Sequence, residues 1–295
     1  MSPQDLAPVD ILRVGNILGE CILWDWRRDA LWWTDIQAKK LHRYDWAHRS
    51  LRVMDTPERV ASFGFVLGST QLIAAFESGV ALYGADDQSV SWLARPEARA
   101  PGERFNDGRV DRHGRFWTGT MLEGGHRAAH GRLYSVGIGG ELRCHVSGIR
   151  ISNGLCQSPD GRRLYFADSP LRRISVYELN ALDGTLGPPR LFAETPEGAY
   201  PDGAAVDADG CVWSAHWGGG CIVRYTPDGK IDRRLRVPTR QPSCVCFGGP
   251  DLELLCVTSA REGLEDSVLS AEPHAGDVFL YRTGIKGLPE SEYRS

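Results

Sequence analysis

Short apolar and aromatic stretches recur along the chain, separated by turn sequences rich in Gly, Asp and Pro. One part of the sequence shows the plan clearly: NGLCQ is followed by SPDG, then by RRLYFADS and RRISVYEL. This order is typical of a strand, a hairpin turn and two further strands. Six segments follow this plan, and none has the 3.6-residue apolar period of a substantial helix. The hydrophobic pattern therefore predicts an all-β protein.

A residue at a fixed position marks the start of each segment, 11 or 12 residues ahead of an apolar residue of the second strand. These starting residues lie 41 to 49 residues apart: Glu20, Ser62, Asn106, Asn153, Asp202 and Ser243. A period of this length with about four short strands per unit is typical of a β-propeller. We therefore expect a single domain over residues 1–295, a six-bladed β-propeller with four-stranded blades. A β-sandwich, the alternative, would not place equivalent residues in six consecutive units.

An apolar stretch at residues 9–14, VDILRV, precedes the first unit. We expect it to form the outer strand of the last blade and to pair with the strand near residues 277–281. This pairing would close the ring and hide edge strands that an open array would expose.

Arranged around an axis, the starting residues converge at one end of it. Four of them carry oxygen ligands, namely Glu20, Asn106, Asn153 and Asp202. Carboxylate and amide oxygens suit Ca²⁺, Mg²⁺ or Mn²⁺, and they can also hold Zn²⁺ or Fe²⁺. We therefore predict one divalent cation with room for a substrate beside it. The alternative is a set of plain turns and strand starts, since Asn-Gly and Pro-Asp-Gly are also turn sequences.

Composition and charge indicate which kinds of partner and location the protein has. Net charge is −4 and the isoelectric point is about 6.1, with Lys and Arg scattered, which gives no footprint for nucleic acid or an anionic membrane. No apolar run approaches the roughly 18 residues of a membrane helix, and no secretory signal is visible. None of the eight cysteines forms a CxxC pair, so we expect buried free thiols rather than disulfides or a thiolate metal site. These features predict a cytoplasmic protein, which we expect to be a monomer or a weak dimer.

Several motifs, in order along nearly the whole chain, carry a family resemblance. They are LGE at 18–20, RFNDG at 104–108, GTM at 119–121, SNGL at 152–155, SPDG at 158–161 and YPDG at 200–203. Together they resemble the SMP-30/gluconolactonase/LRE family, which includes regucalcin and bacterial sugar lactonases. WGG at 217–219 and CFGGPD at 246–251 look like its sugar-acid lactonase branch.

The resemblance implies a six-bladed propeller with one divalent cation in its central channel. The family's metal ligands match Glu20, Asn153 and Asp202. Its substrate contacts match Arg104 and Asn106, and Glu123 is the candidate for a further substrate carboxylate. One departure is at Cys21 and Ile22, where the family usually has Gly and then Pro. The resemblance therefore does not fix the backbone next to Glu20, although the carboxylate itself matches.

These observations predict a metal-dependent hydrolase that opens a sugar lactone, such as glucono-, xylono- or arabinonolactone, to the sugar acid. Asp202 is the expected general base, because it can hold the attacking water from the ligand shell. The alternatives are a hydrolase of another ester or phosphoester, a non-catalytic calcium-binding protein of the regucalcin type, and a plain interaction propeller. Selectivity is expected to rest on the loops around residues 122–132 and 260–275.

Overall fold

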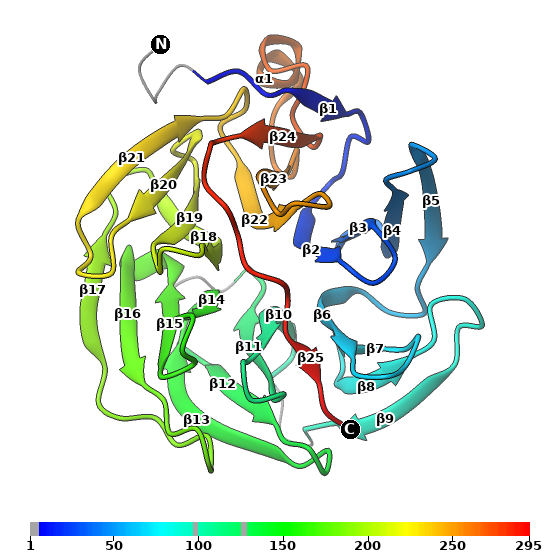
Figure 1. The fold of residues 1–295 in the computed structure, drawn as a ribbon, viewed down its shortest axis with the longest axis vertical. Coiled ribbons are helices and arrows are strands. Elements are labelled where there is room, and N and C mark those ends of the chain that lie inside the picture. Colours follow the sequence, from blue (N-terminus) through cyan, green and yellow to red (C-terminus); the bar gives the residue numbers. More distant parts are fainter. Residues whose placement is uncertain (1–5, 97–99, 125–128) are drawn as a thin grey trace.

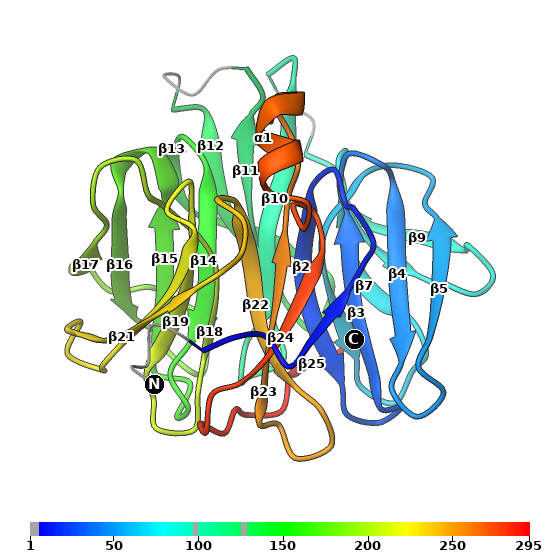
Figure 2. The same ribbon diagram turned by 90° about the horizontal axis from the view of Figure 1, so that it is seen from above.

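The computed structural model describes residues 6–96, 100–124 and 129–295. Over these residues, six sheets are arranged around a central axis, with the first strand of each unit innermost (Figure 1). The expected six-bladed propeller is therefore confirmed. A single short helix, α1 (Asp266–Ala271), occurs in the described part of the chain and stands at one end of the ring (Figure 2).

The first three blades follow the chain from the inside outwards. Blade 1 contains β2 (Gly19–Asp25), β3 (Ala30–Asp35), β4 (Lys40–Asp45) and β5 (Ser50–Asp55). Blade 2 contains β6 (Val60–Val66), β7 (Leu72–Phe76), β8 (Val80–Tyr83) and β9 (Val90–Ala94). Blade 3 contains β10 (Glu103–Val110), β11 (Phe116–Leu122), β12 (Gly131–Val136) and β13 (Leu142–Ile149).

The remaining blades repeat this order until the chain closes on itself. Blade 4 contains β14 (Ser152–Gln157), β15 (Arg163–Asp168), β16 (Arg173–Glu178) and β17 (Arg190–Glu194), with a 3₁₀ turn at Ser169–Leu171. Blade 5 contains β18 (Tyr200–Val206), β19 (Val212–Trp217), β20 (Cys221–Tyr225) and β21 (Ile231–Arg236). Blade 6 contains β22 (Pro242–Gly248), β23 (Leu254–Ser259), β24 (Val278–Arg282) and the N-terminal β1 (Asp10–Leu12).

The closing strand lies where the sequence predicts it, although it is shorter. β1 pairs antiparallel with β24, with Ile11 opposite Phe279. The second blade departs from the expected four strands, because a short C-terminal strand, β25 (Glu292–Tyr293), adds to it in parallel beside β6. The chain reaches this position by crossing the middle of the ring (Figure 1).

The core lies between the blades. The described side chains form six buried clusters, each made mainly by two neighbouring sheets. Most of the cysteines belong to this core as free thiols, as expected, whereas Cys144 is exposed and Cys221 is only partly buried. No helix in the described ranges is long and apolar enough to cross a bilayer.

Candidate active site

The start of each innermost strand is irregular. In all six blades the pairing register between the innermost strand and the next one shifts near this point. Such bulges break the alternation of a strand and re-aim the side chains beside them. In four blades the shifted residues include or adjoin a polar side chain that lines one cavity of about 690 Å³: Glu20, Asn106, Asn153 and Asp202. The two serine positions, Ser62 and Ser243, are fully buried in the wall instead.

A chain of hydrogen bonds fixes the orientation of Asn153. Its Nδ2 donates to the hydroxyl of Ser169 (2.8 Å), and that hydroxyl donates to the carbonyl of Pro201 (2.7 Å). Its Oδ1 accepts a bond from Nδ2 of Asn106 (3.0 Å). An amide oxygen has two lone pairs, so Oδ1 keeps one available for a cation. Asn106 thus positions the candidate ligand Asn153, a contact beyond the substrate role expected from the sequence.

Glu20 and Asp202 are buried carboxylates without a cationic partner. They are 9% and 5% exposed, and neither forms an ion pair within 4.0 Å in the part of the chain that the structure describes. Burial raises the pKa of Glu20 to about 8, with a further contribution from Asp107. Burial also raises the pKa of Asp202 well above its usual range, and the charges of Glu20 and Asp107 add to this shift. The charge of Arg104, which forms no ion pair with either carboxyl, opposes both shifts but does not outweigh burial.

The donor set fits a divalent cation of the hard type. Two carboxylates would balance its charge, and the oxygen of Asn153 would complete a three-residue ligand set with positions left for water or substrate. Clusters of three or more His, Cys, Asp or Glu side chains that could hold a metal are absent among residues 6–96, 100–124 and 129–295. The candidate ligand set contains two such residues and an amide, so it falls below this count.

Arg104 and Glu123 form the polar wall beside this ligand set. Nη1 of Arg104 donates to Oδ1 of Asn106 (2.7 Å), and its Nε donates to Oε1 of Glu123 (2.8 Å). Arg59 donates to the same Glu123 oxygen (2.7 Å). Burial alone would raise the pKa of Glu123, but the bonds from Arg59 and Arg104 outweigh it and hold the pKa below its ordinary value. Glu123 thus lines the cavity as an ionised acceptor.

Other cavity residues were missed from the sequence. Gln37, Ser169, Trp217 and Glu262 line the cavity at or just beyond the end of the second strand of their blades. In an antiparallel pair the end of one strand lies beside the start of its partner, so the end of the second strand lies beside the starting residue of the innermost strand and recurs with the same period. The repeat phase, applied to the second strand, would have found them. Of the two loops expected to set selectivity, 260–275 contributes Glu262 and 122–132 contributes Glu123, while residues 125–128 lie outside the described residues.

Fold and site together define a six-bladed propeller with a cavity lined by polar side chains at one end of its axis. The chain belongs to the SMP-30/gluconolactonase/LRE-like family, whose model matches residues 18–261. The resemblance drawn from the motifs is therefore confirmed.

The relatives of the chain are similar over nearly their whole length. The chain is 38% identical to a 6-deoxy-6-sulfogluconolactonase of Pseudomonas putida, covering 95% of this chain and 96% of the relative. It is 36% identical to an L-arabinolactonase of Azospirillum brasilense, covering 94% and 92%. Among solved structures, regucalcin from Agrobacterium tumefaciens, described as a calcium-binding protein, superposes with a TM-score of 0.93 at 31% identity, covering 98% and 99%.

Proposed function

We propose that the protein hydrolyses the lactone of a sugar acid and that a divalent cation held by Glu20, Asn153 and Asp202 takes part. The lactonase class of the enzyme follows from its relatives, of which several are named sugar lactonases. The observation that supports a bound cation is the pair of buried carboxylates that form no ion pair and lie beside a fixed amide oxygen. When bound, such a cation supplies Lewis acidity, which polarises an ester carbonyl.

Proton transfer and substrate binding are assigned to side chains of the cavity. Asp202 accepts the proton of the attacking water, since a carboxylate of the ligand set lies beside the water that it holds. Arg104 holds ring hydroxyls or the oxygen that gains charge as the water adds. Asn106 donates both of its N–H groups to Ser152 and Asn153, so it accepts a bond from a ring hydroxyl through Oδ1. Glu123 accepts a hydrogen bond from a substrate hydroxyl with the lone pairs that its arginines leave free.

The cavity favours an enzyme over the alternatives. Its volume of about 690 Å³ lies within the roughly 300–1,000 Å³ of small-molecule sites and exceeds the needs of an ion alone. A non-catalytic calcium binder would use the same ligands without requiring this space. A plain interaction propeller would require no buried carboxylates there.

The test is acid release from a panel of five- and six-carbon aldonolactones, with spontaneous hydrolysis subtracted. Protein loaded with Ca²⁺, Zn²⁺, Mn²⁺, Mg²⁺ or Fe²⁺ is expected to exceed the background on at least one lactone. Phosphate and aryl esters in the same panel test the other hydrolase hypotheses. If no loaded form exceeds the background on any lactone, the proposal fails, and cation binding without turnover would favour the calcium binder.

Two variants separate the proposed roles of the site residues. Asn106→Ala should lower the rate at saturating metal by about 5- to 150-fold, the effect of losing one or two directed hydrogen bonds. Asp202→Asn should lose far more rate while keeping some metal, because an amide oxygen still ligates but accepts no proton. A near wild-type rate of metal-loaded Asp202→Asn would exclude Asp202 as the base and leave Glu20 as the next candidate.

A further inference from the structure

The C-terminal segment is built into the end of the channel opposite the cavity. Tyr293 is 1% exposed, and its hydroxyl donates to the carbonyl of Gly137 (2.7 Å). The backbone of Arg294 donates to the carbonyl of Gly114 (3.0 Å), which lies in the hairpin that follows β10. β10 therefore runs from the cavity, at one end of the channel, to the C-terminal segment at the other end.

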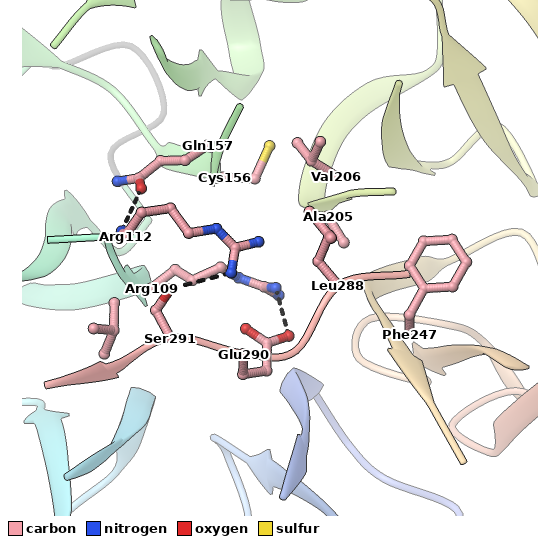
Figure 3. Close-up of a pocket in the computed structure, with 11 residues that line it drawn as sticks. Arg109, Arg112, Cys156, Gln157, Ala205, Val206, Phe247, Leu288, Glu290 and Ser291 are labelled. Atoms are coloured by element: carbon pink, nitrogen blue, oxygen red, sulfur yellow. Dashed lines mark hydrogen bonds and ion pairs between the residues drawn. The ribbon is translucent and has the colours of Figure 1, made fainter. Parts of the chain in front are cut away.

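Glu290 of this segment meets an arginine inside the channel (Figure 3). Its carboxylate lies 2.9 Å from Nη1 of Arg109, and the side chains are 12% and 14% exposed. Arg109 also donates to the carbonyl of Val245 (3.2 Å). Beside this pair, Arg112 donates to the carbonyl of Pro289 (2.7 Å). The cavity that remains here is about 30 Å³, which is room for little more than water.

Asp107 lies between this pair and the candidate active site. It shares β10 with Arg109, and its carboxylate accepts bonds from the backbone of Gly108 and Leu155, both 2.8 Å. Burial raises the pKa of Asp107, and the charge of Arg109 opposes this shift. Asp107 directly follows Asn106, which lines the cavity, and its bond from Leu155 joins it to β14, the strand that carries Asn153. From the cavity toward the C-terminal segment, the charged side chains are therefore Asp107, which is negative like the ligand carboxylates, then Arg109 and then Glu290.

We propose that Asp107, Arg109 and Glu290 form an axial charge column behind the cation site, and that Glu290 sets the affinity of the site by compensating Arg109. This inference rests on the cation site of the proposed function. Without the charge of Glu290, Arg109 would stand uncompensated in a buried channel and oppose a divalent cation at the other end of the column. Glu290 is thus a positioning residue that acts through Arg109 and Asp107.

The test compares three variants by isothermal titration calorimetry with MnCl₂ and with CaCl₂, at pH 7.5 and at pH 8.5. Glu290→Gln should weaken binding by roughly 5- to 50-fold, as expected for one unit charge acting within a Debye length. The matched control is Glu292→Gln, which removes another ion pair of the same segment, with Arg27 at 2.5 Å, and should stay within about twofold of wild type. The double variant Arg109→Gln/Glu290→Gln removes a neutral pair and should recover most of the affinity.

Each outcome decides between the column and its alternatives. Equal weakening by Glu290→Gln and Glu292→Gln would show that anchoring of the segment matters, rather than the column. A double variant as weak as Glu290→Gln alone would likewise overturn the proposal, as would a Glu290→Gln variant with wild-type affinity. Thermal unfolding of the metal-free variants verifies that each is folded. Wild-type protein that binds neither ion would instead refute the cation site of the proposed function.

Discussion

At the scale of single residues, the site depends on how one amide is held. Asn153 is fixed from both ends, by Ser169 through Nδ2 and by Asn106 through Oδ1. An amide can otherwise rotate and present its NH₂ group, which repels a cation. The sequence identifies Asn153 through its place in the repeat, but the role of Ser169 depends on a contact between the end of β15 and the start of β14, which the spacing of starting residues does not describe.

Ser169→Ala tests whether the hydrogen bond from Asn153 to Ser169 holds the amide in this orientation. Loss of the hydroxyl frees Nδ2 of Asn153, so the affinity for Ca²⁺ should fall by about 0.5–1.5 kcal/mol, or roughly 2- to 13-fold. Ser158→Ala removes a turn hydroxyl of the same blade, which bonds Asp160, and serves as the control in the same calcium titration. Unchanged affinity in Ser169→Ala would show that the amide is held without this bond.

At the scale of elements, the bulge at the start of the innermost strand makes the site. In β14 the position after Asn153 is Gly154, with φ of 66°, and in β2 the position after Glu20 is Cys21, with φ of 47°. Glycine adopts this left-handed region readily, whereas other residues are strained there. The family resemblance leaves the backbone at Cys21 undetermined. The structure keeps the bulge and stabilises it by a bond from the backbone N–H of Phe63 to Sγ of Cys21 (3.1 Å).

Substitution at Cys21 should expose this strain. Cys21→Val places a β-branched residue at positive φ and should destabilise the protein by about 1–3 kcal/mol. Cys21→Gly relieves the strain but loses the contacts of Sγ, so it should stay within about 1 kcal/mol of wild type. Urea unfolding measures both, with Cys156→Val as the control at a buried cysteine without positive φ. Equal stability of the two Cys21 variants would contradict the account of the bulge.

At the scale of the whole molecule, the ring brings the starts of the six innermost strands together. This convergence needs only the repeat period, because each segment adds its own blade in turn. This is why the blade count, the closing strand and the gathering of Glu20, Asn106, Asn153 and Asp202 follow from the period of the sequence. The C-terminal segment does not follow from it. β25 is only two residues long and pairs with a strand more than 200 positions earlier, so no local pattern marks it.

The buried carboxylates should give the metal-free protein an unusual pH dependence. The pKa of Glu20 rises from 4.5 to about 8 on folding, so the native state binds a proton that the unfolded chain releases in this window. Stability should therefore fall as pH rises from about 4.5 to 8, and cation binding should strengthen over the same range because the ligands must lose their protons. Urea unfolding in a chelator at several pH values measures this. Glu20→Gln should show a weaker dependence, and an equally steep one would assign the effect to another group.

The measurement that tests the central claim most directly is a titration of Mn²⁺ into chelator-stripped protein, with occupancy and lactone hydrolysis followed in the same samples. The account predicts a rate that rises in proportion to occupancy and reaches its plateau at one ion per chain. Asp202→Ala should bind far less metal and show no such rise. Full hydrolysis by the stripped protein, or unchanged metal stoichiometry in Asp202→Ala, would contradict the claim that these ligands hold a cation that takes part in the reaction.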